Sequence, residues 1–119
     1  MNGNLIFVYS MEGCPWCKLL KEKLTESNID FIDRPIEKYA YEYAKFKTVT
    51  KNELVPAMVM MRLPQVLKED SKAEKIVYLC PDTDFKDLDE ALTKVVEFVN
   101  YHEHDLIINN ESNKDQVLD

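Results

Sequence analysis

The sequence predicts a single α/β domain, in which a mixed four-stranded sheet is flanked by three main helices. Two observations lead to this fold class. Short apolar runs rich in β-forming residues alternate with amphipathic helical stretches along the chain. The length of 119 residues, with 45% hydrophobic and 31% charged residues, suits one domain with its own buried core.

The first part of the chain is predicted to form a strand, a helix and a second strand. Residues 5–9 are a continuous apolar run that fits a buried central strand. Residues 16–27 have helical periodicity, and residues 29–33 alternate as a strand does. The apolar face of the helix consists of Cys17, Leu20 and Leu24. A helix between two strands implies a right-handed crossover and a parallel strand pair.

The second part is predicted to add a helix, two strands and a last helix. Residues 36–51 are a helix candidate rich in tyrosine. Strands are expected at 57–61 and 76–79, and the polar connection 62–75 between them lacks a full helix, which implies an antiparallel pair. Residues 85–101 form a strongly amphipathic helix. Its apolar stripe consists of Leu88, Leu92, Val95, Val96 and Val99.

Charge and cysteine usage weigh against several classes of function. The net charge of −7 argues against nucleic acid as the main partner, because phosphate binding needs clustered cations. We expect no membrane association, since no signal segment is visible and no run approaches the ~20 apolar residues of a membrane helix. Three cysteines, two of them close together, do not resemble a structural disulfide framework. We therefore expect a cytoplasmic protein, and a monomer as the default for this size.

The motif that carries chemistry is Cys14-Pro15-Trp16-Cys17, which follows a strand and opens a helix. Two intervening residues let one helical turn bring the sulfurs into bonding range. Unpaired N–H groups at the helix N-terminus favour a thiolate at Cys14, and can lower a thiol pKa from about 8.5 to about 3.5–7.5. A thiolate attacks disulfides. Cys14 is thus the predicted nucleophile and Cys17, one turn further, the resolving thiol.

Two other interpretations of the pair are weaker. A structural zinc site usually takes four ligands, but the chain has no second cysteine pair, and His102 and His104 lie far along the sequence. We therefore expect no metal. Two idle core cysteines at a strand–helix junction are expected even less.

With a later Leu54-Val55-Pro56 at the start of a strand, residues 5–101 resemble the glutaredoxin family of the thioredoxin fold. The sequence CPWC is close to the family's CPYC, and LVP stands where the family has TVP. The segment 83–85 looks like the family's acidic motif before the last helix. The resemblance implies a glutaredoxin-like domain at 1–104. Residues 105–119 are acidic and polar, and we expect a flexible tail there.

The resemblance implies a glutathione-dependent thiol–disulfide oxidoreductase, with glutathione as co-substrate and no tightly bound cofactor. Pro56 would be cis, and the backbone of Val55 would pair with the cysteinyl part of glutathione. Thr83 and Asp84 would hold its γ-glutamyl end, and Trp16 would line the groove. Disulfide-containing proteins are the expected partners, and family analogy suggests ribonucleotide reductase as one client.

Other interpretations of these residues stay open. Pro56 could be an ordinary trans proline at a strand start. Thr83 and Asp84 could simply cap the last helix. Cys80 could be a buried small hydrophobe or, if its strand ends near the substrate groove, an additional redox thiol.

Two differences from the family keep rival functions open. Cys80-Pro81 stands where the family usually has Gly-Gly, and Met11 stands where it often has Lys or Arg. They favour, as the first alternative, a thioredoxin-like reductase recycled by a flavoprotein reductase. The second is an iron–sulfur or metal carrier, which Pro15 disfavours because cluster-binding members tend to lack that proline. The third is a non-catalytic interaction module, which would need neither thiol of the motif.

Overall fold

The computed structural model describes residues 4–64, 73 and 75–111, with side chains described as far as residue 100. The chain order is strand, helix, strand, helix, strand, strand, helix, as the sequence predicts. The elements are β1 (Asn4–Ser10), α1 (Pro15–Glu26), β2 (Ile32–Pro35), α2 (Ala40–Thr50), β3 (Ala57–Arg62), β4 (Lys75–Leu79) and α3 (Leu88–Glu111).

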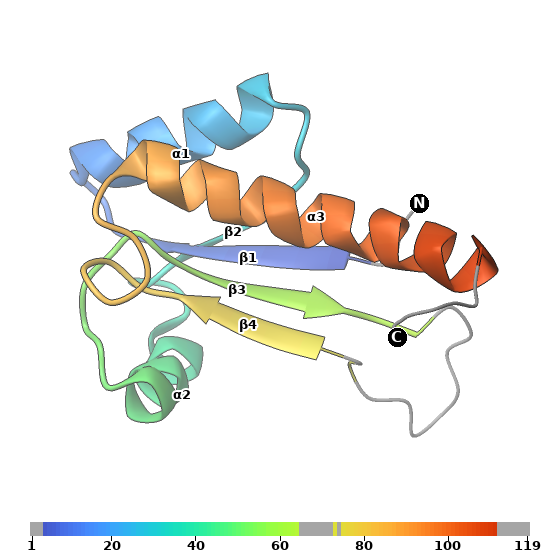
Figure 1. The fold of residues 1–119 in the computed structure, drawn as a ribbon. Helices are drawn as coiled ribbons and strands as arrows, with labels where there is room; N and C mark the ends of the chain where they lie inside the picture. Colours follow the sequence, from blue (N-terminus) through green and yellow to red (C-terminus); the bar gives the residue numbers. More distant parts are fainter. Residues whose placement is uncertain (1–3, 65–72, 74, 112–119) are drawn as a thin grey trace.

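The strands form one mixed sheet in the order β2-β1-β3-β4 (Figure 1). β1 pairs with β2 in parallel, with Phe7 opposite Ile32. β3 is antiparallel both to β1 and to β4. The expected parallel first pair and antiparallel last pair are therefore confirmed, and the fold is a thioredoxin-like α/β fold.

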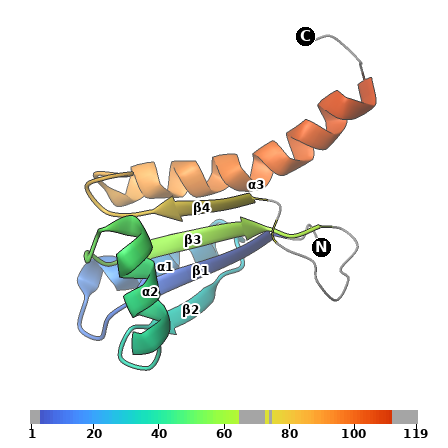
Figure 2. The ribbon, with the colours of Figure 1, turned by 90° about the horizontal axis from the view of Figure 1, so that it is seen from below.

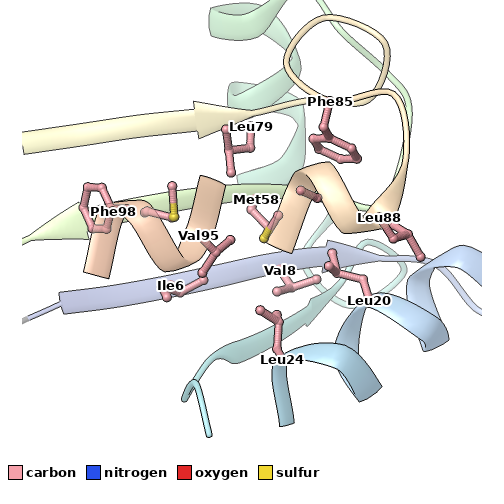
Figure 3. Close-up of a cluster of buried hydrophobic side chains, with 12 residues drawn as sticks. Ile6, Val8, Leu20, Leu24, Met58, Leu79, Phe85, Leu88, Val95 and Phe98 are labelled. Atoms are coloured by element: carbon pink, nitrogen blue, oxygen red, sulfur yellow. The ribbon is translucent and has the colours of Figure 1, made fainter. Parts of the chain in front are cut away.

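The helices lie on both faces of the sheet: α1 and α3 cover one face, and α2 covers the other (Figures 1 and 2). Alternation along β1 explains the two layers, because successive side chains of a strand point to opposite faces. Val8 packs in the main core between the sheet and helices α1 and α3 (Figure 3). Tyr9 packs instead with Tyr43 and Phe46 of α2. The main core consists of Ile6, Val8, Leu20, Leu24, Met58, Met60, Leu79, Phe85, Leu88, Ala91, Val95 and Phe98.

The first helix has the predicted face and position. Cys14 is its N-cap residue and Pro15 occupies its first turn, where a missing N–H costs nothing. Leu20 and Leu24 are fully buried against the sheet and α3. The Lys23 ammonium lies 3.0 Å from the Asp89 carboxylate, which joins α1 to the start of α3. Helix α1, at whose N-terminus the cysteines lie, is thus held against the sheet and α3.

Two predicted boundaries in the second quarter of the chain are wrong. The second strand pairs over Ile32–Pro35 and not from residue 29, because Ile29 and Phe31 pack into the core before pairing with β1 begins. Helix α2 starts at Ala40 and not at residue 36, because a turn intervenes. In this turn the N–H group of Tyr39 donates to the Pro35 carbonyl at 3.0 Å.

The last helix begins later and ends later than predicted. Phe85 is buried in the loop before α3, where its carbonyl accepts the Asp82 N–H at 2.9 Å. The helix continues to Glu111, so the predicted end near residue 101 is wrong and the predicted domain boundary at 104/105 falls within α3. That boundary stays a prediction. Residues 112–119 of the predicted tail and most of the 62–75 connection lie outside the described residues. Among the helices described, none has the length and apolar character that crossing a membrane requires.

Candidate active site

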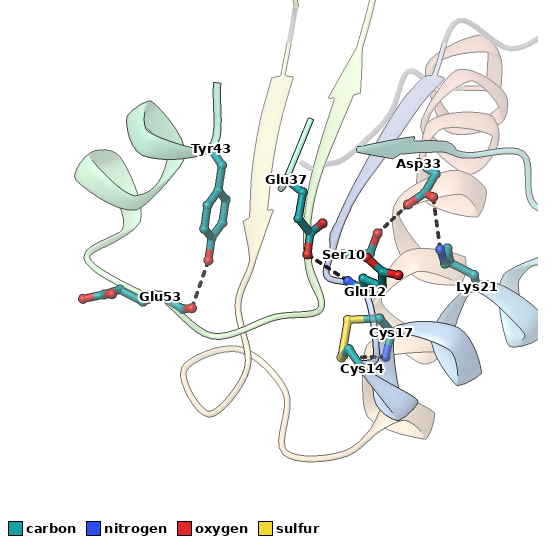
Figure 4. Close-up of a disulfide and its surroundings, with 9 residues drawn as sticks. All are labelled: Ser10, Glu12, Cys14, Cys17, Lys21, Asp33, Glu37, Tyr43 and Glu53. Atoms are coloured by element: carbon teal, nitrogen blue, oxygen red, sulfur yellow. Dashed lines mark hydrogen bonds and ion pairs between the residues drawn. A yellow bond between two sulfur atoms is a disulfide. The ribbon is translucent and has the colours of Figure 1, made fainter. Parts of the chain in front are cut away.

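The two cysteines of the CPWC motif form a disulfide at the N-terminus of α1 (Figure 4). Their Cα atoms are 5.3 Å apart. The N–H group of Cys17 donates to the Cys14 sulfur at 3.2 Å, so the Cys14 side chain caps the helix. Cys17 is only 1% exposed, whereas Cys14 is half-buried. Of the two sulfurs, the one at Cys14 is therefore the more open to a substrate.

A tight turn delivers the chain from β1 to Cys14. Gly13 adopts a φ of +76°, a left-handed conformation that favours glycine. The N–H group of Cys14 donates to the Met11 carbonyl at 3.3 Å. The N–H group of Glu12 donates to a carboxylate oxygen of Glu37 at 3.0 Å, which ties this turn to the segment after β2 (Figure 4). The cysteines are thus fixed both by the helix and by the turn before it.

A pocket of about 460 Å³ opens beside the disulfide. Its lining residues are Met11, Glu12, Gly13, Cys14, Pro15, Cys17, Lys18 and Lys21. The Lys21 ammonium lies 3.0 Å from the Asp33 carboxylate, which also accepts the Ser10 hydroxyl at 2.7 Å (Figure 4). This ion pair offsets the charge of Lys21 toward the pocket. The neighbouring Trp16 is 45% exposed and offers a flat apolar surface at the edge of the site.

The segment before β3 contains a cis peptide bond between Val55 and Pro56, as the resemblance implies, and the trans alternative is wrong. Pro56 is buried and Val55 is half-buried. The Tyr43 hydroxyl of α2 donates to the Glu53 carbonyl at 2.9 Å, and burial raises the pKa of Tyr43 (Figure 4). Because the hydroxyl stays protonated, it remains a donor to this segment.

The loop after β4 folds back on itself. The Asp84 carboxylate accepts the Cys80 N–H at 2.8 Å, and the Asp84 N–H donates to the Cys80 carbonyl at 2.9 Å. Asp87, and not Thr83 or Asp84, accepts an N–H of the first turn of α3, from Glu90 at 2.8 Å. The alternative that Thr83 and Asp84 merely cap the last helix is therefore wrong.

The sequence of this chain is similar to known proteins. A family model described as Glutaredoxin matches residues 6–69, more than half of the chain. A curated relative from Clostridium pasteurianum is an uncharacterized glutaredoxin-like 8.6 kDa protein in a rubredoxin operon. It is 37% identical over 54 residues, which make up 45% of this chain and 72% of the relative.

The chain belongs to the glutaredoxin family. Membership and the Cys14–Cys17 pair assign it to the thiol oxidoreductases in general. The matched part of this glutaredoxin includes the CPWC motif and the cis-proline segment. Thr83 and Asp84 lie beyond the match, so the role in glutathione binding that is expected of them rests on the sequence resemblance alone.

Cys80 does not take part in the Cys14–Cys17 disulfide and lies in the environment of a core residue. It is 2% exposed and packs with Tyr9, Tyr43 and Phe46 under α2. Burial raises the pKa of the Cys80 thiol, a hydrogen bond with Thr50 partly offsets this, and the Asp84 charge adds to the increase. The raised pKa favours the protonated thiol, which is the less nucleophilic form. These observations favour the interpretation of Cys80 as a small, buried hydrophobic residue. Its additional redox role stays a prediction.

Replacing Cys80 by alanine is expected to leave disulfide turnover unchanged and to lower the free energy of unfolding by about 1 kcal/mol, an ordinary cost for a buried position. In the oxidised wild-type protein, iodoacetamide should modify Cys80 far more slowly than in denaturant. The raised pKa of Cys80 also predicts how stability depends on pH. Because the folded protein holds the thiol proton more tightly than the unfolded chain does, the free energy of unfolding should fall as the pH rises above the ordinary thiol range. A clear loss of turnover in Cys80→Ala would instead indicate a redox role.

Sequence reasoning missed Asn52 and Glu37, which reach the site from outside its motifs. Asn52 joins two segments of the site through its amide, and Glu37 holds the turn before Cys14. Neither has a sequence signal, because each acts on residues that only the fold brings close. In the described part of the chain, no three His, Cys, Asp or Glu side chains gather as a metal site would require.

Proposed function

We propose that this glutaredoxin uses glutathione to reduce protein disulfides and glutathione mixed disulfides, with Cys14 as nucleophile and Cys17 as resolving thiol. The observation that carries the proposal is the unequal exposure of two disulfide-bonded cysteines at a helix N-terminus, of which Cys17 is buried and Cys14 is half-buried. Only the sulfur of Cys14 is open enough for an incoming disulfide. The Cys17 N–H that contacts it would also stabilise a Cys14 thiolate, because hydrogen bonding to a charged form favours that form.

The reduction of a protein disulfide proceeds in two displacements. The Cys14 thiolate attacks one substrate sulfur; a new S–S bond forms, the substrate S–S bond breaks, and the second substrate sulfur leaves as a thiolate that takes up a proton. Cys17 then loses its proton and attacks the Cys14 sulfur. The bond between Cys14 and the substrate breaks, the substrate sulfur that was attacked first leaves as a thiolate and takes up a proton, and the Cys14–Cys17 disulfide forms. The two electrons come from the two cysteines of the motif.

Two glutathione molecules would restore the dithiol. The first attacks Cys14, which gives a Cys14–glutathione mixed disulfide and frees Cys17 as a thiol. The second attacks the glutathione sulfur of that mixed disulfide, releases the Cys14 thiolate and leaves as glutathione disulfide. Removal of glutathione from a protein needs only the second of these steps, after Cys14 has taken over the glutathione. Cys17 is then not required.

The proposed glutathione groove runs from Trp16 past the cis-proline segment to the loop after β4. The Val55 backbone would pair with the cysteinyl part, and Thr83 and Asp84 would hold the γ-glutamyl end. Asp84 is half-buried, and one of its carboxylate oxygens already accepts the Cys80 N–H. A chemistry that draws on reduced glutathione also fits the proposed cytoplasmic location.

The test is a glutathione-coupled assay with the mixed disulfide of glutathione and 2-mercaptoethanol, in which glutathione reductase and NADPH report the glutathione disulfide formed. We expect turnover that saturates with the mixed disulfide. The matched comparison uses thioredoxin reductase in place of glutathione, with a protein disulfide as substrate.

Turnover with thioredoxin reductase alone would contradict the proposal and favour the thioredoxin-like alternative. One observation supports that alternative: Met11, which is 43% exposed, stands beside the disulfide where the family often has a cation. The two assays therefore separate the source of electrons from the chemistry at Cys14.

A further inference from the structure

We propose that Asn52 is a positioning residue of the glutathione groove, which turns the hydroxyl hydrogen of Thr83 outward so that it donates to a carboxylate of the substrate. The inference rests on the proposed function, and it adds the residue that orients the Thr83 hydroxyl at the γ-glutamyl end. Asn52 belongs to neither the CPWC motif nor the acidic motif, and its role follows from three hydrogen bonds of its side chain.

The Asn52 side chain joins the segment before the cis-proline to the loop after β4. Its Nδ2 lies 3.0 Å from the Pro81 carbonyl oxygen and 3.2 Å from Thr83 Oγ1. Its Oδ1 accepts the Leu54 N–H at 2.8 Å. Residues 52 and 83 are 31 positions apart in sequence, so this one amide fixes the spacing of two chain segments that would both contact glutathione.

The partners determine which end of the amide faces which segment. The Leu54 N–H can only donate, so it must face the oxygen of the Asn52 amide. The Pro81 carbonyl can only accept, so it must face the nitrogen. Reversing the amide would break both bonds at once. The NH₂ group of Asn52 therefore points toward Thr83.

This orientation fixes the direction of the Thr83 hydroxyl. A hydroxyl has one hydrogen to donate and two lone pairs to accept with. Because the Asn52 NH₂ group is a donor, Thr83 Oγ1 accepts from it, and the hydroxyl hydrogen points elsewhere. Thr83 is exposed, so this hydrogen is available to a ligand. The α-carboxylate of a γ-glutamyl group would accept it in a charge-assisted hydrogen bond.

The backbone around Asn52 is itself held in place. Lys51 ends α2 in a left-handed conformation with a φ of 59°, and the Asn52 N–H donates to Thr50 Oγ1 at 3.3 Å. The Tyr43 hydroxyl then holds the next carbonyl, at Glu53. The end of α2 thus presents the Asn52 amide to the 81–83 loop.

The test uses Asn52→Asp, which has nearly the same shape. One carboxylate oxygen can still accept the Leu54 N–H, but the other is an acceptor where the wild-type protein has a donor. The Thr83 hydroxyl would turn inward to donate to it. Reduced protein is mixed with excess disulfide in a single turnover, and the fluorescence of Trp16, the only tryptophan, reports oxidation. Two disulfides are compared: glutathione or Cys-Gly, each joined to 2-mercaptoethanol.

We expect Asn52→Asp to raise the half-saturating concentration of the glutathione disulfide about 10-fold, as for the loss of one hydrogen bond to a charged group. The limiting rate should not change, and the Cys-Gly disulfide, which lacks the γ-glutamyl group, should be unaffected. Asn100→Asp, the same substitution on the exposed side of α3, controls for the added charge and should match the wild type.

Variants of Thr83 distinguish an effect of Asn52→Asp on the orientation of the Thr83 hydroxyl from simple repulsion between the new carboxylate and the substrate carboxylate. In a Thr83→Val background there is no hydroxyl to turn, so Asn52→Asp should cost much less there. Thr83→Val alone should raise the same half-saturating concentration, whereas Thr83→Ser should behave as the wild type. These two single variants test the hydroxyl donor even if Asn52→Asp fails to fold.

The outcomes distinguish this inference from the proposed function. A wild-type protein that handles the two disulfides equally well would overturn glutathione recognition itself. A wild-type protein that prefers the glutathione disulfide, together with an Asn52→Asp variant of unchanged preference, would overturn only the role of Asn52. An effect of Asn52→Asp that persists undiminished in Thr83→Val would do the same, because it could not act through the hydroxyl.

Discussion

Replacing Cys14 by serine is expected to reduce the turnover of every disulfide substrate to the uncatalysed background. Cys14 carries the more exposed sulfur of the pair, and its position at the N-cap of α1 favours a thiolate. A serine hydroxyl would remain a neutral, weak nucleophile at neutral pH. The buried Cys17 cannot replace it, because its side chain is covered by the core. The glutathione-coupled assay measures the loss directly.

The Cys80→Ala variant is the matched control for Cys14→Ser, because it also removes one thiol but from the far face of the sheet. It should keep wild-type turnover. Urea unfolding of both variants excludes a folding defect as the cause of lost activity. If Cys14→Ser retained full turnover while Cys17→Ser lost it, the assigned roles would be reversed.

The elements that carry the cysteines were predictable because each follows one clear local rule. Residues 5–9 form a continuous apolar run, and β1 is one of the two inner strands of the sheet, a place that suits such a run. Leu20 and Leu24 recur at helical spacing, and both are fully buried. The proline after Cys14 marks the first turn of α1. Local pattern and tertiary packing agree here, which is why the motif is placed correctly.

The boundaries that sequence reasoning missed depend on contacts between distant segments. Residues 29 and 31 have the alternation of a strand, but their side chains are used for packing on the core before pairing begins. Phe85 has the right spacing for the last helix, yet it is buried in the preceding loop. In both cases an apolar residue packs into the core although it lies in the loop before the helix or strand begins.

In the candidate site, only the residues that belong to a recognisable sequence motif could be predicted. The family resemblance supplies the cis-proline at Pro56, which periodicity alone would not predict. It does not supply the Asn52 amide, because the bond from this amide to Thr83 joins segments that lie far apart in the sequence. Nor does composition indicate that Lys21 is paired with Asp33. The electrostatics of the pocket therefore emerge only when strands β1 and β2 are aligned beside α1.

Replacing Cys17 by serine is expected to separate two reactions that the wild-type protein carries out. Reduction of a protein disulfide should be lost, because the mixed disulfide on Cys14 has no neighbouring thiol to resolve it. Removal of glutathione from a mixed disulfide should persist at a rate of the same order, since free glutathione resolves that intermediate from solution. The measurement compares a protein disulfide with the glutathione–mercaptoethanol disulfide, using the same protein preparation.

The geometry also predicts the step at which the Cys17→Ser variant stops during reduction of a protein disulfide. Because Cys14 still attacks, a covalent complex with the client should accumulate in a one-to-one ratio when no free thiol is present, and it should appear by mass spectrometry. Dithiothreitol should release the client. The double variant Cys14→Ser/Cys17→Ser should trap nothing, which shows that the complex forms through Cys14. A Cys17→Ser variant that still completes protein-disulfide reduction would mean that another thiol resolves the intermediate. The candidate would then be Cys80, despite its burial under α2.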